Sequence, residues 1–219
     1  MKVSAVLSAV ASILALNLAG SWLWCDRSEA AESVSELARA SIRACESGRA
    51  AVDRSARLSH FKESQQLAER AIALDERHPD AHFALFCTLG EQLRIDGENL
   101  TSIFGYRKMM RELERTLELD PEHLGALSAK GTFLVRLPAL LGGDREKGEA
   151  LLQWVIHRAP DAVNARLNLA KSFCARGVHD QAIVLATEAL SLAQSQHLPD
   201  FILEIQTALS AMRARQTPH

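Results

Sequence analysis

The chain has 219 residues, of which 47% are apolar, 24% charged and 5% aromatic, and its formal net charge is -2. This length suits one domain with a sizeable core, and the composition is that of a folded protein rather than a disordered one. Because a chain with so little excess charge lacks the basic surface that binding to a phosphate backbone requires, we expect no nucleic-acid partner.

The first 30 residues differ in character from the rest. After Lys2 the stretch 3–24 carries no charged side chain, and a short basic start followed by an apolar run is typical of secretory signals. Small residues at Ser28 and Ala30 offer a cleavage site, which favours a cleaved signal peptide. A retained anchor is the alternative, because about 20 apolar residues can span a bilayer as a helix.

Both alternatives place the bulk of the chain outside the cytoplasm. We therefore expect a signal peptide or membrane anchor over 1–30, followed by a folded domain over 31–219 that is periplasmic or anchored facing the periplasm. A lipid anchor on Cys25 fits less well, since Trp24 stands where a lipobox has a small residue.

Besides Cys25, the chain has three cysteines, none of them in a CxxC pair, so zinc-ribbon and thioredoxin-like sites have no support. We favour the interpretation of Cys45, Cys87 and Cys174 as small apolar helix residues. A disulfide between two of them, in an oxidising compartment, stays open as the alternative.

Helical periodicity runs from about residue 33 to residue 215, without a strand pattern. The fold class that we predict is therefore all-α. The expected helices cover 33–58 (with a break around Gly48 left open), 61–75, 80–93, 99–119, 123–137, 145–158, 162–176, 179–195 and 199–215.

Several helices end alike, in the segments 68–82, 112–127, 151–167 and, in part, 185–194. Aligning Ala71, Thr116, Val155 and Ala189 gives spacings of 45, 39 and 34 residues. The last spacing is the period of tetratricopeptide (TPR) repeats, and the first two indicate insertions. Self-similarity of this kind predicts a solenoid of helix-turn-helix units.

The segment 164–193 resembles a TPR motif. It has the leucine, small and aromatic residues of a first helix, a glycine that ends that helix, and the alanines of a second; these are Leu169, Ala170, Phe173, Gly177, Ala182, Ala186 and Ala189. Arg166 stands where the motif often has Trp. The resemblance implies about four repeats with insertions and a C-terminal helix that caps the last apolar face.

A long second helix ending in LELDP, then LPALLGGDREK, then APDAVNARLNLAKSF, resembles the TatT-type TPR proteins of the periplasm, which are associated with TRAP transporters. This resemblance covers about 66–193. It implies a role beside a solute-binding protein or transporter, handling an apolar or carboxylate ligand.

No HExxH, GxSxG, Walker or dinucleotide-binding pattern occurs, so we expect no enzyme and no cofactor. His78 and His82 are four residues apart, as two metal ligands on one helix would be. Pro79 lies between them and no third ligand is near, so we interpret them as turn histidines and expect no metal site.

TPR arrays bind partners on the concave surface of their first helices. Carried over position by position, that groove comprises Phe83, Cys87, Glu91, Ser128, Thr132, Arg136, Asn164, Leu167, Asn168 and Lys171. Arg136, Asn168 and Lys171 have the cationic and amide groups that donate hydrogen bonds to a carboxylate. Because the full clamp pattern is missing, ordinary exposed polar residues are the favoured interpretation of these three.

The insertion 134–152 replaces a short turn and contains Leu137, Pro138, Ala139, Leu140 and Leu141. A loop this apolar either folds onto its own solenoid, which we slightly favour, or contacts a partner. The function that we expect is a non-catalytic TPR adaptor of the cell envelope, associated with a TRAP transporter. The alternative is a structural scaffold for protein-protein interactions in envelope assembly. The identity of the partner and the oligomeric state stay open.

Overall fold

A computed structural model describes residues 33–96 and 101–216 of the protein. These residues form α-helices joined by turns and one short 3-10 helix, with no strand among them. The all-α prediction is therefore confirmed. The predicted signal peptide or anchor lies outside the described residues and stays a prediction. No helix in the described part of the chain is both long and apolar enough to cross a membrane.

The helices follow one another with short connections. Their bounds are α2 (Val34–Ala50), α3 (Arg54–Leu74), α4 (Pro79–Asp96), α5 (Thr101–Leu119), α6 (Leu124–Arg136), η1 (Ala139–Leu141), α7 (Arg145–Arg158), α8 (Val163–Ala175), α9 (His179–Ser195) and α10 (Pro199–Gln216).

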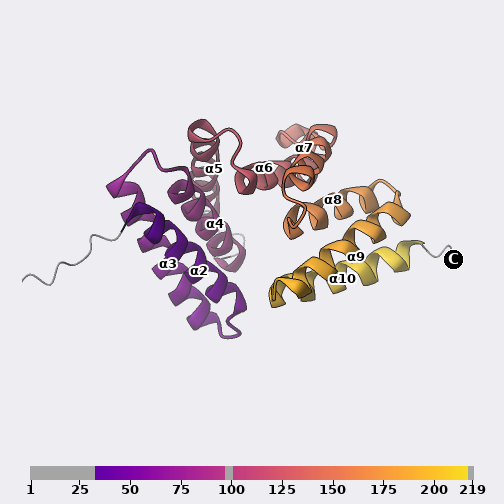
Figure 1. Cartoon of the computed structure of the whole chain (residues 1–219), viewed down its shortest axis with the longest axis horizontal. Helices are drawn as coiled ribbons and strands as arrows, with labels where there is room; N and C mark the ends of the chain where they lie inside the picture. The colour runs from indigo at the N-terminus through magenta and orange to yellow at the C-terminus, as the bar shows by residue number, and fades with distance from the viewer. Residues whose placement is uncertain (1–32, 97–100, 217–219) are drawn as a thin grey trace, which may run out of the picture. The chain divides into compact units, whose positions relative to one another are not determined.

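Neighbouring helices pack as hairpins within the compact unit Val34–His219 (Figure 1). The hairpins are α2 with α3, α4 with α5, α6 with α7, and α8 with α9, while α10 packs on α9. This arrangement confirms the predicted TPR-like solenoid of helix-turn-helix units with a final capping helix.

The break near the N-terminal end of the solenoid lies elsewhere than expected. Helix α2 continues through Gly48 and ends at Ala50, and α3 begins at Arg54. Asp53 sets the start of α3, because its carboxylate accepts a hydrogen bond from the backbone N–H of Ala56 at 2.9 Å and so caps the helix. Gly48 is not a helix breaker but a point of close packing, discussed below.

Two of the turns between hairpins, the α3–α4 turn and the α5–α6 turn, share an Asx-type geometry. The Asp75 and Asp120 carboxylates accept hydrogen bonds from the backbone N–H groups two residues later, at 2.9 and 3.0 Å. His123 then caps α6, since its Nδ1 accepts the N–H of Ala126 at 3.1 Å. Its Nε2 lies 3.0 Å from Asp80 Oδ1 on α4, so the cap also joins two successive repeats.

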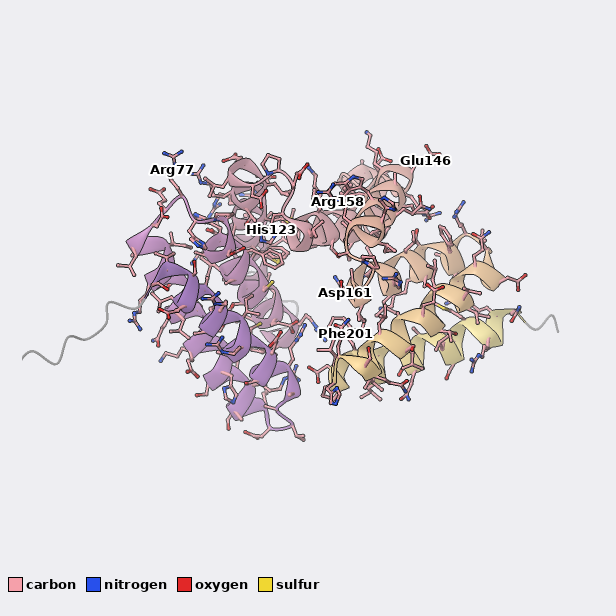
Figure 2. The ribbon with its side chains drawn as sticks, in the orientation of Figure 1. Arg77, His123, Glu146, Arg158, Asp161 and Phe201 are labelled. Carbon is pink, nitrogen blue, oxygen red and sulfur yellow. The ribbon has the colours of Figure 1, made fainter. Side chains whose placement is uncertain are left out.

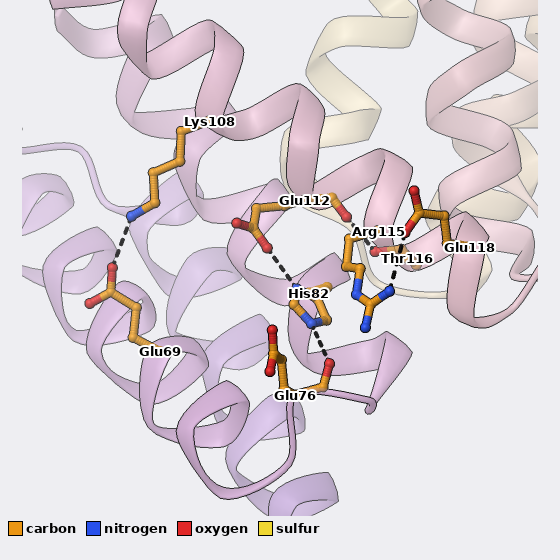
Figure 3. Close-up of polar contacts among 8 residues, drawn as sticks. All are labelled: Glu69, Glu76, His82, Lys108, Glu112, Arg115, Thr116 and Glu118. Atoms are coloured by element: carbon orange, nitrogen blue, oxygen red, sulfur yellow. Dashed lines mark hydrogen bonds and ion pairs between the residues drawn. The ribbon is translucent and has the colours of Figure 1, made fainter.

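His82 ties the start of α4 to α5 (Figure 3). Its buried ring lies 2.7 Å from Glu112 Oε2 through Nδ1 and 2.9 Å from the Glu76 carbonyl through Nε2. Lys108, one turn before Glu112 on α5, donates to Glu69 on α3 at 3.1 Å. Lys108 thus links α3 and α5, the second helices of successive hairpins, whereas His82 links α4 to α5 and to the preceding turn.

The core between the helices consists of small residues that pack against large ones. Four alanines of α9, which are Ala182, Ala186, Ala189 and Ala193, are fully buried against α8 and α10. Arg166, at the position of the motif's Trp, is only 8% exposed. Its Nε lies 3.5 Å from Glu188 Oε2, so the long side chain fills the Trp position while its charge is partly paired.

Candidate functional site

A cavity of about 970 Å³ opens on the face formed by the first helices of the hairpins. Most of its lining comes from α4, α6 and α8, and the rest comes from α2, α5, α7, α10 and the turns before α8 and α10. Figure 2 labels Asp161, just before α8, and Phe201, on α10, both of which line it. A volume of this size is in the upper range of ligand-binding sites.

One wall of the cavity is aromatic. Phe83 and Phe86 of α4 stack with ring centroids 5.8 Å apart, and Phe133 of α6 meets the edges of Phe86 and Tyr106, each at 6.3 Å. The tip of the Phe83 ring can pack closely on α6 because Gly125 has no Cβ, which would stand 2.6 Å from Phe83 Cζ. This wall offers an apolar surface to a ligand.

The other wall is polar and belongs mainly to α8. Asn168 donates to the carbonyl and the side-chain oxygen of Asn164, at 2.9 and 2.8 Å, and Asn164 donates to Ser128 Oγ at 3.4 Å. Lys171 Nζ pairs with Glu204 Oε1 on α10 at 2.6 Å. The donors of this wall are therefore largely engaged by one another.

Two arginines that line the cavity have N–H groups without a hydrogen-bond acceptor among the described residues. Arg136, at the end of α6, is exposed and makes no hydrogen bond or ion pair with any described residue. Arg49 of α2 has a buried Nε without a hydrogen-bond partner among the described residues. Asp200 Oδ2 is 3.9 Å from Nε and Glu91 Oε1 is 4.0 Å from Nη1, both beyond hydrogen-bond distance.

Two thiols, Cys45 and Cys87, lie in the wall between α2 and α4. Burial, and after it the nearby Glu91 carboxylate, raises the pKa of Cys45 from 9.0 to about 12. Burial raises the pKa of Cys87 in the same direction. Both are free thiols, as is Cys174, and a thiol that stays protonated is a poor nucleophile.

No protein-family model matches the sequence, and no curated protein gives a significant match. Among solved structures, the thermophilic TPR protein TTC0263 of Thermus thermophilus is similar with a TM-score of 0.56 and 17% identity, over 85% of this chain and 84% of that one. The protein has the TPR fold.

Two further TPR structures show weaker similarity. Yeast Tom70 has a TM-score of 0.46 and 18% identity, over 87% of this chain and 45% of its own. YrrB, a TPR protein with an unusual peptide-binding site, has a TM-score of 0.36 and 14% identity, over 68% of this chain and 85% of its own.

In this TPR fold, the predicted groove residues occupy one cavity. Those that line it are Phe83, Cys87, Glu91, Ser128, Thr132, Arg136, Asn164, Asn168 and Lys171. The prediction for Leu167 is wrong, because Leu167 is 1% exposed and packs in the core. Its side chain points about 100° away from that of the next residue, Asn168, around the helix axis. Ligand binding by the other nine stays a prediction.

Sequence reasoning missed several lining residues of this TPR cavity. Tyr106 and Met109 belong to the second helix α5, whereas the alignment took only first helices. Arg49 and Phe201 lie outside the aligned repeats of 66–193. Their α-helical periodicity carried no signal that distinguished them, because only tertiary packing brings α2 and α10 to the cavity.

The leucines of the insertion loop do not pack onto the solenoid, which the sequence analysis had favoured. Leu140 is 95% exposed and Leu141 66% exposed, whereas Leu137 is half-buried and Pro138 exposed. The physical reason is the loop's own turn: Gly142 adopts a φ of 88°, and the Gly143 N–H donates to the Pro138 carbonyl at 3.0 Å. The turn holds η1 away from the core.

The two spaced histidines have separate partners. His78 Nε2 lies 3.0 Å from Ser35 Oγ on α2, whereas His82 contacts Glu76 and Glu112. Among the residues for which the structure gives positions, no group of three His, Cys, Asp or Glu side chains could hold a metal ion.

Proposed function

We propose that this protein is a non-catalytic adaptor that binds an extended peptide segment of a partner protein in the cavity of its first helices. The observation that carries the proposal is the pairing of an aromatic wall with a polar wall across about 970 Å³. An extended peptide presents side chains alternately to two sides, together with backbone donors and acceptors. Phe83, Phe86 and Phe133 would take its apolar side chains.

The polar groups define the other half of the ligand. Asn164 is exposed, so its amide can bond a peptide backbone, and Arg136 has donors free for a carboxylate. We therefore expect preferred peptides to combine an apolar side chain with an acidic group. Asn168 and Lys171 act mainly through the contacts that hold this wall in place.

The test is selection from a displayed peptide library with residues 31–219 as bait. Arg136→Ala should weaken the selected peptides about tenfold, the lower end of the effect of a charged hydrogen bond. Arg145→Ala, an exposed cation outside the cavity lining, is the matched control and should leave the affinity unchanged. If Arg136→Ala, Asn164→Ala and Arg145→Ala bound the selected peptides with equal affinity, this cavity would be ruled out as the binding site.

We also propose that the adaptor acts outside the cytoplasm beside a TRAP transporter; only the sequence resemblance and the apolar stretch 3–24 support this. Alkaline phosphatase fused after Ala31 should be active with the first 30 residues present and inactive without them. A solute-binding protein should be captured by the wild-type protein in its native envelope. Equal phosphatase activity of both fusions would contradict export.

A structural scaffold is the second candidate, and the exposed leucines of the insertion loop favour it. Leu140 and Leu141 present apolar surface that a partner could cover. Leu140→Ser with Leu141→Ser should then abolish partner capture while Arg136→Ala leaves it intact. The adaptor proposal predicts the reverse pattern, so the two variants together separate the candidates.

A further inference from the structure

Helices far apart in the sequence meet at the mouth of the cavity. The C-terminal end of α2 and the N-terminal end of α10 are in contact, and both line the cavity. Arg49 makes the polar part of this contact: its Nε lies 3.9 Å from Asp200 Oδ2, and its guanidinium lies 5.3 Å from the centre of the Phe201 ring. Phe201 is labelled in Figure 2.

The contact is much weaker than those that hold each end in place. Helix α2 packs along α3 and α10 packs along α9 over most of their lengths, with Leu37, Ala193 and Ile205 fully buried. By contrast, the Arg49 ion pairs are longer than hydrogen bonds, and its buried Nε has no acceptor among the described residues. Such a guanidinium is held in place but not fully bonded.

We propose that Arg49 is a latch: its contact with Asp200 and Phe201 closes the cavity, and its release opens the cavity to an extended ligand. The latch rests on the cavity being the binding site, but it concerns access rather than affinity. A solenoid can open in this way because each hairpin contacts mainly its neighbours, so small rotations between hairpins add up at the ends. Glu91, on α4, keeps the released guanidinium at the cavity wall.

The test measures the distance between α2 and α10 without a ligand. Fluorophores are attached through bioorthogonal amino acids at the exposed positions Ser47 and Gln206, and single-molecule energy transfer gives the closed and open populations. Arg49→Ala removes the Asp200 ion pair and the Phe201 cation–π contact between α2 and α10, so it should raise the open-to-closed ratio about fivefold. Asp200→Asn, at a half-exposed position, should raise it less.

Arg115→Ala is the matched control, because Arg115 pairs with Glu118 within α5 and does not join two hairpins (Figure 3). Its open-to-closed ratio should equal that of the wild-type protein. Salt at about 1 M screens partly exposed charges, so it should open the wild-type protein and have little effect on Arg49→Ala. Circular dichroism verifies that each variant is folded. If Arg49→Ala is unfolded, the open-to-closed ratio of Asp200→Asn is compared with that of the wild-type protein instead.

Unchanged distances in Arg49→Ala and in high salt would overturn the latch, since other contacts would then hold α2 against α10. Equal opening in Arg115→Ala would overturn it as well. Because no peptide is present, these outcomes are independent of the library selection. A failed selection with a working latch would reject the proposed ligand, and a successful selection with unchanged distances would reject only the latch.

Discussion

At Gly48, α2 has no side chain because the ring of Phe61 occupies the space. A Cβ there would lie 2.5 Å from Phe61 Cε1, and Phe61 is fully buried, so its ring cannot move aside. Gly90 is a useful contrast: its Cβ would lie 3.5 Å from Met109 Sδ, an ordinary contact. Both glycines are helical, so they differ in packing rather than in backbone conformation.

We therefore expect opposite effects of alanine at the two positions. Gly90→Ala should stabilise the protein by up to about 1 kcal/mol, because alanine is the better helix former. Gly48→Ala gains the same propensity but should lose about 1–3 kcal/mol through overpacking, for a net loss. Urea unfolding of both variants gives the comparison, and a stabilising Gly48→Ala would show that the α2–α3 interface can widen freely.

The buried thiol of Cys45 gives stability a dependence on pH. Its pKa is about 12 in the folded protein and near the ordinary 9.0 when unfolded. The folded state therefore retains a proton that the unfolded state releases, so this stabilisation is complete below pH 9 and lost as the pH rises towards 12. The free energy of unfolding should fall less steeply over that range in Cys45→Ala. The same slope of unfolding free energy against pH in the wild-type protein and in Cys45→Ala would contradict a raised pKa of Cys45.

At the scale of elements, the insertion loop is an exposed turn with hydrogen bonds at its base. The backbone N–H of Asp144 donates to the Leu134 carbonyl at 2.9 Å, and the Asp144 carboxylate caps α7 by accepting the Lys147 N–H at 3.1 Å. The loop is thus braced at its base while Leu140 and Leu141 project into solvent. Bracing of this kind orders a loop before any partner arrives.

Because its leucines bury little surface, the loop should contribute little to stability. Leu140→Ser with Leu141→Ser should change the free energy of unfolding by less than about 0.5 kcal/mol, as surface substitutions usually do. Leu152→Ala, at a fully buried position of α7, is the control and should cost about 2–5 kcal/mol. A fall of several degrees in the melting temperature of the double variant would show that the leucines pack internally after all.

At the scale of the whole solenoid unit, α10 covers the apolar face that α9 would otherwise expose. Its buried residues are Ile205, Leu209 and Met212, and each large side chain covered in this way contributes about 1.5–3 kcal/mol. A TPR array without such a cap exposes a continuous apolar strip and tends to aggregate.

Truncation after Gln196 should therefore lower the melting temperature by roughly ten degrees or more, at about 2–4 °C for each kcal/mol lost. Light scattering on heating should rise earlier than in the intact protein. Leu203→Ser is the control, since Leu203 is on the same helix but exposed. An unchanged melting temperature after truncation would mean that α9 alone closes the solenoid.

The sequence by itself determined the helices, their order and the first-helix face. This information was local, because the period of apolar residues, the glycine after α8 and the Asp-Pro turn after α5 each concern a single helix or a single turn. Repeat alignment then carried Phe83, Ser128 and Asn168 onto one face, because each repeat places the same position towards the same side. The break before α3 was misplaced because the cap at Asp53 is a single-residue signal within a helical pattern.

Tertiary structure decided which residues line the cavity and which are only adjacent in sequence to a lining residue. Leu167 and Asn168 are adjacent, yet one is buried in the core and the other lines the cavity, since a helix turns about 100° for each residue. Arg49 meets Phe201 although three complete hairpins separate α2 and α3 from α10, a contact set by the accumulated rotation of the stacked hairpins. No local pattern encodes that rotation, because it depends on how every helix pair packs against the next.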